Sequence, residues 1–275
     1  AYLKPKFNLE ITFVEGKEVA EFENAIQSNT SLIFLESPSS AVFSLQNISG
    51  VTALAKSKGI KTIIDNTWAT PLFQKPLAMG VDLEMHSCSK YIGGHSDVVA
   101  GVLIGKAKLI DSISLREYEW IGAKMAPFEA WLLLRSLRTF TVRVKQHQAN
   151  AKVVAEFLDQ HPKIELVRYP GLDHFDQKEL AHQQMTGFTG LMGFQLKTTN
   201  LPSIKKFVNS LQLFQIGVSW GGHESLIYAP AISYLKELSP DQFDALGISL
   251  GDMRISVGLE NAQDLIDDLN QALDG

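Results

Sequence analysis

The chain has 275 residues, of which 45% are hydrophobic and 20% are charged, proportions typical of a globular protein with a sizeable core. They exclude a disordered, collagen-like or coiled-coil chain. A formal net charge of −5 argues against nucleic acid as the main partner, because binding to phosphates requires a basic surface. The single cysteine and the lack of an apolar run of roughly 18 to 20 residues predict a cytoplasmic protein without a membrane span.

Short apolar segments alternate with helix-like segments through the first half of the sequence. We expect strands at residues 10–14, 31–35, 61–64, 82–86 and 99–104, and helices at residues 18–27, 48–58 and 71–79. This alternation predicts an α/β fold with a mostly parallel sheet covered by helices. The strand segments are almost continuously apolar, which is typical of strands buried on both faces.

The pattern changes after Ala126, where helical periodicity runs from residue 128 to about 161 with an interruption near residues 139–141. Further on, strands at 191–196 and 253–257 mix with helices at 201–211 and 261–273. We therefore divide the chain into a large domain of residues 1–145 and a smaller C-terminal α+β domain of residues 146–275. We interpret the acidic residues of the last helix as a solvated face rather than a metal site: Asp264, Asp267, Asp268 and Asp274.

Several catalytic patterns occur only in incomplete form. Residues 247–251 read Gly-Ile-Ser-Leu-Gly, but a helix before and a strand after them reverse the order that a hydrolase nucleophile elbow needs. We therefore interpret them as a loop. His223-Glu224 lacks the second histidine of a zinc-protease helix, and the other histidines are scattered, so we expect no metal site.

Polar side chains gather where two of the predicted parallel strands end. Asp65 ends one strand, and Ser87, Ser89 and Lys90 end the next. Open α/β sheets bind their ligands at this edge. An acid, hydroxyls and a lysine are what pyridoxal phosphate (PLP) requires for its pyridine nitrogen, its phosphate and its aldehyde, respectively. Taken alone, Asp65 is explained equally well as a strand-end cap.

These residues resemble the Cys/Met-metabolism family of PLP-dependent enzymes, which includes cystathionine lyases and synthases and methionine γ-lyase. The resemblance extends in order over essentially the whole chain. The segments that carry it are 35–38 (LESP), 64–71 (IDNTWATP), 87–97 (SCSKYIGGHSD), 135–139 (RSLRT), 169–172 (YPGL) and 254–260 (RISVGLE).

The resemblance implies the aspartate-aminotransferase-like α/β fold, which is fold type I of PLP enzymes. In that fold, Lys90 would bind the cofactor aldehyde and Asp65 the pyridine nitrogen. Ser87 and Ser89 would hold the phosphate. Arg254, in the second domain, would hold the α-carboxylate of the substrate, a task that suits a bidentate guanidinium.

Two segments favour a β-lyase over the γ-type enzymes. The family usually has an asparagine after Glu-Ser-Pro, where this chain has Ser39-Ser40, and Ser219-Trp220 is more similar to bacterial cystathionine β-lyases. Ser219 would then help to hold the carboxylate, and Trp220 would line the substrate site. A tryptophan packed between the two domains is the alternative interpretation of Trp220.

We therefore expect a PLP-dependent carbon–sulfur lyase that converts cystathionine or cysteine-like substrates to pyruvate, ammonia and a thiol such as homocysteine. A γ-type enzyme of the same family is the first alternative: cystathionine γ-synthase, cystathionine γ-lyase or methionine γ-lyase. The partner would be a small sulfur amino acid, with no nucleic acid or membrane involved.

Family members also carry an N-terminal portion that this sequence lacks, which supplies a tyrosine stacked on the cofactor and residues that reach a neighbouring subunit. We therefore expect this chain to be part of a longer enzyme, with an N-terminally incomplete large domain. A catalytically incomplete fragment that serves folding or oligomerisation is the second alternative. The resemblance also implies a homotetramer built from two dimers.

Overall fold

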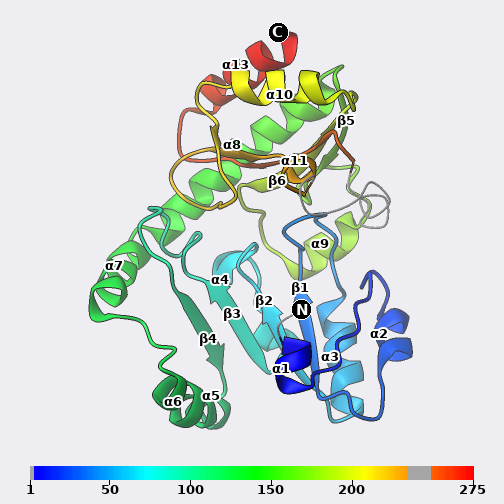
Figure 1. Cartoon of the computed structure of the whole chain (residues 1–275), viewed down its shortest axis with the longest axis vertical. Coiled ribbons are helices and arrows are strands. Elements are labelled where there is room, and N and C mark those ends of the chain that lie inside the picture. The colour runs from blue at the N-terminus through cyan, green and yellow to red at the C-terminus, as the bar shows by residue number, and fades with distance from the viewer. Residues whose placement is uncertain (1–2, 235–248) are drawn as a thin grey trace.

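A computed structural model of the chain describes residues 3–234 and 249–275. The described strands form two sheets (Figure 1), one of four strands in the order β1-β2-β3-β4 and one of five in the order β5-β6-β9-β8-β7. The strands are β1 (Leu32–Glu36), β2 (Lys61–Asp65), β3 (Leu83–Ser87), β4 (Gly101–Gly105), β5 (Ile164–Arg168), β6 (Leu191–Leu196), β7 (Gln215–Ile216), β8 (Leu226–Tyr228) and β9 (Asp252–Ser256).

The described helices lie between and around these strands. They are α1 (Leu3–Phe7), α2 (Val19–Ala25), α3 (Ile48–Ser57), α4 (Thr70–Phe73), the 3₁₀ helix η1 (Pro76–Met79), α5 (Ala107–Ile113), the π-helical η2 (Ser114–Tyr118), α6 (Glu119–Ile121), α7 (Pro127–Leu137), α8 (Phe140–Gln160), α9 (Lys178–Gln184), α10 (Leu201–Ser210), α11 (Pro230–Tyr234) and α13 (Ala262–Asp274). No helix in the described parts of the chain is both long and apolar enough to cross a bilayer.

Strands β1, β2 and β3 are parallel, and β4 pairs antiparallel with β3 at the edge of the sheet. Parallel neighbours need a crossover connection, which α3 provides between β1 and β2, and α4 with η1 between β2 and β3. The four strands lie within two residues of the segments expected at 31–35, 61–64, 82–86 and 99–104. The sheet is therefore mostly parallel, as the sequence predicts.

Two expected elements differ from the structure. The strand predicted at residues 10–14 is wrong, because this segment is irregular and pairs with no described strand; the Phe13 side chain is 90% exposed. An apolar segment becomes a strand only where a neighbouring backbone edge accepts its hydrogen bonds. The single helix expected at 71–79 is divided into α4 and η1, because Pro76 disfavours a helical backbone at Lys75 before it.

Burial on both faces is also wrong for the four-stranded sheet, because only every second residue of β2 and β3 is buried and the outer strands are more exposed. On β1, Ile33 and Leu35 are buried with Ile48 and Val51 of α3, whereas the intervening Phe34 is 56% exposed. The side chains of β4 are exposed or half-buried throughout. An apolar sequence permits burial on either face, but the covering elements decide which face is buried.

The five-stranded sheet is mostly antiparallel and is covered by helices of the second half of the chain. Figure 1 shows α8, in green, running from α7 beside the four-stranded sheet up to the five-stranded sheet. Residue 145, the domain boundary expected from the sequence, lies within this continuous helix.

Side chains that follow β2 and β3 anchor the first sheet to the second. Trp68 is buried, and its indole N–H donates to the Leu191 carbonyl at the start of β6, over 3.0 Å. The Thr189 hydroxyl donates to the Trp68 carbonyl over 2.7 Å, and the Tyr91 hydroxyl accepts the Gly190 N–H over 2.8 Å. The ends of the parallel strands therefore face the second sheet across buried contacts.

The interpretation of the last helix as a solvated acidic face is wrong for Asp268. This carboxylate is buried and accepts the backbone N–H groups of Gln212 and Leu213 over 2.8 Å and of Phe214 over 3.1 Å. A buried carboxylate is tolerated when backbone donors satisfy it. Asp264, Asp267 and Asp274 are exposed, as expected.

The Gly-Ile-Ser-Leu-Gly segment leads into β9. Residues 247 and 248 lie outside the described residues. In the rest of the segment, the Ser249 N–H donates to Asp252 Oδ2 over 2.8 Å, and the Gly251 N–H donates to the Ser249 hydroxyl over 3.2 Å. These contacts make Ser249 part of a turn, in agreement with the loop interpretation.

Candidate active site

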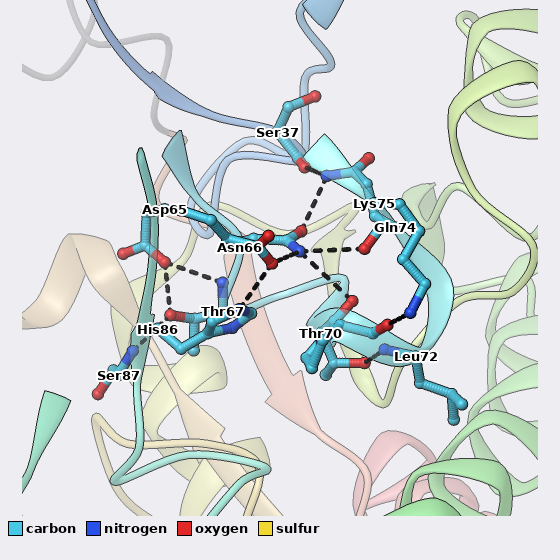
Figure 2. Close-up of polar contacts among 12 residues, drawn as sticks. Ser37, Asp65, Asn66, Thr67, Thr70, Leu72, Gln74, Lys75, His86 and Ser87 are labelled. Atoms are coloured by element: carbon cyan, nitrogen blue, oxygen red, sulfur yellow. Dashed lines mark hydrogen bonds and ion pairs between the residues drawn. The ribbon is translucent and has the colours of Figure 1, made fainter. Parts of the chain in front are cut away.

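Asp65, the last residue of β2, is half-buried on one face of the four-stranded sheet (Figure 2). Its Oδ1 accepts the Thr67 N–H over 2.9 Å and also the Thr67 hydroxyl. That hydroxyl accepts the Ser87 N–H over 2.8 Å, which joins the ends of β2 and β3. Asp65 Oδ2 receives no hydrogen bond from any described residue, so this oxygen can accept one from a ligand.

The next residue, Asn66, points to the opposite, buried face (Figure 2). Its amide donates to Glu84 Oε1 over 2.7 Å, and its Oδ1 accepts from Gln74 Nε2 over 2.9 Å. Gln74 Nε2 also donates to the Ser37 carbonyl over 2.8 Å, and Glu84 Oε1 lies 2.8 Å from His86 Nε2. We call Ser37, Asn66, Gln74, Glu84 and His86 the buried polar network; it fixes the loops that frame Asp65.

Lys90 follows β3 in a tight turn. Its N–H donates to the Ser87 carbonyl over 3.1 Å, and its carbonyl accepts the Gly94 N–H over 2.7 Å. Gly94 has φ +67°, and a Cβ atom there would lie 1.8 Å from Arg143 Nη1, so a side chain would strain the backbone and displace the Arg143 guanidinium. Arg143 occupies this space because its guanidinium donates to the Tyr91 carbonyl over 2.8 Å. The backbone around Lys90 is therefore fixed from both sides.

The Lys90 amine extends to residues from the second half of the chain. It donates to the Ser219 hydroxyl over 2.8 Å and lies 5.2 Å from the centre of the Trp220 ring. Partial burial lowers the Lys90 pKa, and the nearby Arg254 charge lowers it further, while the Asp65 charge acts in the opposite direction. A lower pKa increases the fraction of neutral amine, which is the form that attacks a carbonyl carbon.

Arg254, on β9, contacts residues in or next to the two segments, 39–40 and 219–220, that favour a β-lyase over the γ-type enzymes. Its Nη1 donates to the Ser40 carbonyl over 3.1 Å, and its Nη2 donates to the Val218 carbonyl. Its guanidinium carbon lies 5.1 Å from the centre of the Tyr228 ring. Ser40 and Val218 thus meet at Arg254, whose charge is close enough to act on the Lys90 amine.

The two serines expected to hold phosphate differ in their contacts. The Ser89 hydroxyl accepts the Ala100 N–H over 3.1 Å and lies 3.4 Å from the Ala100 carbonyl. The Ser87 hydroxyl has no hydrogen bond to any described residue. Between them, Cys88 is buried, and burial raises the pKa of its thiol, so it is not an activated nucleophile.

The structure thus brings together Lys90, Ser219, Trp220 and Arg254, with Asp65 close enough to influence the Lys90 charge. Thr67 is a functional residue that we did not expect from the sequence. A signal for it exists, because aspartate commonly accepts the N–H two residues further on. The contact between Ser96 and Glu224 has no local signal in the sequence, because 128 residues separate the two side chains.

The chain belongs to the family of Cys/Met-metabolism PLP-dependent enzymes, whose sequence profile matches residues 1–274. It is 39% identical to an L-methionine gamma-lyase of Pseudomonas putida, over 98% of this chain and 67% of the relative. It is 36% identical to a cystathionine gamma-lyase of Bacillus subtilis, over 98% of this chain and 70% of the relative. It is 37% identical to a cystathionine beta-lyase of Lactococcus lactis, over 95% of this chain and 68% of the relative.

The family is enzymatic and PLP-dependent, and these relatives are lyases. The chain spans about two thirds of their length. Relatives with β- and γ-type names have similar identities, so identity does not distinguish the two reactions.

The residues present fit PLP on chemical grounds. Lys90 offers an amine whose pKa is lowered by burial, and Asp65 offers an oxygen with no described donor. The Ser87 hydroxyl, at the end of β3, offers a donor for phosphate.

Proposed function

We propose that this chain contains the active site of a PLP-dependent lyase that eliminates the β-substituent of cystathionine or a cysteine-like amino acid. In this reaction, cystathionine and water give homocysteine, pyruvate and ammonia. The observation that carries the proposal is the Lys90 amine, hydrogen-bonded to Ser219 and beside Trp220, with its pKa lowered by burial and by Arg254.

Three kinds of side chain would hold the cofactor. Lys90 Nζ would bind its aldehyde carbon, and Asp65 Oδ2 would accept a hydrogen bond from its protonated pyridine nitrogen. The Ser87 and Ser89 hydroxyls would donate to its phosphate. When bound, PLP supplies an electron sink that permits the α-proton of the amino acid to leave.

The remaining residues would bind and orient the substrate. The Arg254 guanidinium would hold the α-carboxylate with two parallel hydrogen bonds, assisted by the Ser219 hydroxyl. Lys90 Nζ would then take the proton from the α-carbon, for which a neutral amine is required. Trp220 would cover the reacting carbons and exclude water.

The preference for β-elimination rests on two segments that both contact Arg254. Residue 40 contacts it through a carbonyl, and the turn that carries Ser219 and Trp220 contacts it through the Val218 carbonyl. The γ-type reaction is the second candidate, because relatives at up to 40% identity are named methionine gamma-lyase.

The first experiment records the visible spectrum of the purified chain with added PLP, before and after borohydride. We expect an absorbance band from PLP bound to the chain, and we expect borohydride to make this attachment covalent. Lys90→Ala should lack both the band and the covalent attachment. A covalent adduct of equal yield in the variant would contradict the role of Lys90.

Turnover of cystathionine then distinguishes the two reactions by product. Pyruvate and homocysteine indicate β-elimination, whereas 2-oxobutyrate and cysteine indicate γ-elimination. The second pair of products would contradict the proposed reaction while leaving the proposed cofactor site intact.

We further propose that residues 1–145 form the larger, cofactor-binding domain and residues 146–275 the smaller one. The homotetramer of two dimers expected from the resemblance also stays a prediction, which light scattering of the purified protein would test.

A further inference from the structure

The turn of residues 218–222 contacts both groups that the proposed reaction needs most. Its Ser219 hydroxyl accepts from the Lys90 amine, and its Val218 carbonyl accepts from Arg254. A displacement of this turn would therefore disturb the amine and the guanidinium together.

The middle of the turn is seated directly on the backbone of Lys90. Gly221 has φ +77°, and a Cβ atom there would lie 2.8 Å from the Tyr91 nitrogen and 3.2 Å from the Lys90 carbonyl carbon. The Gly221 N–H donates to the Ser256 hydroxyl, two residues beyond Arg254 on β9, over 3.0 Å. Only a glycine with this conformation allows so close an approach.

A second attachment lies just beyond the turn. The hydroxyl of Ser96, on the loop that follows Lys90, donates to Oε1 of Glu224. The Glu224 side chain is 23% exposed, and its Oε2 lies 3.1 Å from His223 Nδ1. A hydrogen bond to a carboxylate is stronger than one between neutral groups, so this contact can hold two loops that are distant in sequence.

We propose that the Ser96–Glu224 hydrogen bond is a latch that fixes the 218–222 turn against the Lys90 loop, and that Ser96 and Glu224 are positioning residues. Neither residue forms a hydrogen bond or ion pair with Lys90 or Arg254 among the described residues, so both act through the turn. The latch keeps the Ser219 hydroxyl at the amine and the Val218 carbonyl at the guanidinium. The expected effect of the latch on KM rests on the proposed function. Its expected effect on the position of the 218–222 turn does not.

The first test measures hydrogen exchange of the Gly221 amide in the purified chain without added PLP. Ser96→Ala and Glu224→Ala are each expected to accelerate exchange about tenfold, because each removes one charge-assisted hydrogen bond. The double variant should exchange no faster than either single variant, because both remove the same bond. Glu224→Gln keeps an acceptor for Ser96 and should retain most of the protection.

The matched control is Glu156→Ala, which removes an exposed carboxylate that is 3.9 Å from Lys152 on α8 and should leave Gly221 exchange unchanged. Unchanged exchange in both single variants would overturn the latch, and so would additive effects in the double variant. Both single variants remove exposed or partly exposed groups, and unaltered exchange in the β6 core would verify that they fold.

The second test uses the PLP-loaded protein and cystathionine. Ser96→Ala and Glu224→Ala should raise KM about tenfold with a smaller change in kcat, and Glu224→Gln should restore KM, because Arg254 would lose its support in the free enzyme. A KM equal to that of the parent would overturn the latch as a positioning device. Absence of turnover in the parent protein, with the expected exchange result, would contradict the proposed function and leave the latch standing.

Discussion

The two faces of the four-stranded sheet differ where β2 and β3 end. On one face, Asp65 and Ser87 are half-buried, and each keeps a polar atom without a described partner. On the other face, Asn66, Glu84 and His86 are buried and hydrogen-bonded to one another. Because side chains alternate along a strand, neighbouring residues serve different purposes. Unsatisfied polar atoms mark the face for ligands, and satisfied ones mark the face that maintains the fold.

The largest expected effect comes from Asp65→Asn, which tests the first face. The amide can still accept both hydrogen bonds from Thr67, so the free energy of unfolding should change by less than about 0.5 kcal/mol. Given the role proposed for Asp65 at the pyridine nitrogen, the loss of its charge should slow turnover by about 10²- to 10³-fold. Single-turnover kinetics and urea unfolding of the same preparation measure both quantities. Turnover at the parental rate would contradict the role of Asp65.

Asn66→Ala tests the second face, one residue further along the chain. It leaves the buried Glu84 carboxylate and the Gln74 amide short of a partner, so we expect a loss of about 3 kcal/mol in the free energy of unfolding. Urea unfolding measures this loss. A stability equal to that of Asp65→Asn would remove the distinction between the two faces.

A third prediction concerns the protonation of His147, one of two buried histidines. His86 lies against the Glu84 carboxylate, whereas Nδ1 of His147, on α8, lies 2.8 Å from the Val257 carbonyl and its Nε2 has no described partner. Burial lowers the pKa of His147 from 6.5 to about 4, opposed by the Val257 carbonyl; the Arg143 charge lowers it further, and Glu224 raises it. The folded protein therefore holds this side chain neutral.

Between pH 4 and 6.5, unfolding takes up a proton at His147. The free energy of unfolding should therefore rise with pH through this window by about 3 kcal/mol, and His147 should add nothing more above it. His147→Gln, which cannot titrate and can still donate to Val257, should lack this part of the pH dependence. Urea unfolding at several pH values measures the free energy of unfolding of the parent and the variant. The contributions of the other titrating groups cancel in the difference between the two proteins. Parallel curves would contradict a neutral buried His147.

The smallest expected effect comes from Thr67→Val, which removes the hydroxyl that connects Asp65 to the Ser87 N–H. We expect turnover and PLP affinity to fall about fivefold, corresponding to one hydrogen bond. Thr67→Ser keeps the hydroxyl and should behave as the parent. Equal losses in both variants would indicate that the methyl group, rather than the hydroxyl, is important.

Local pattern and resemblance predict much of this molecule, since Asp65 ends β2 and the motif that contains Lys90 follows the end of β3. The same reasoning fails where tertiary contacts decide. The apolar segment at residues 10–14 has no strand beside it, and Asp268 is buried because three backbone donors from another segment reach it. The meeting of Lys90 with Ser219 and Arg254 brings together distant parts of the chain, which the motifs alone do not place.

Cys88, the single cysteine of the chain, has a practical consequence for labelling. Its thiol is buried and its pKa is raised, so alkylating reagents that require a thiolate should react with it slowly. A cysteine introduced at an exposed position, such as His223, would carry a fluorophore or spin label selectively in the otherwise natural chain. Because Cys88 should react slowly, spectroscopy of this chain can use the introduced cysteine as its single labelled site.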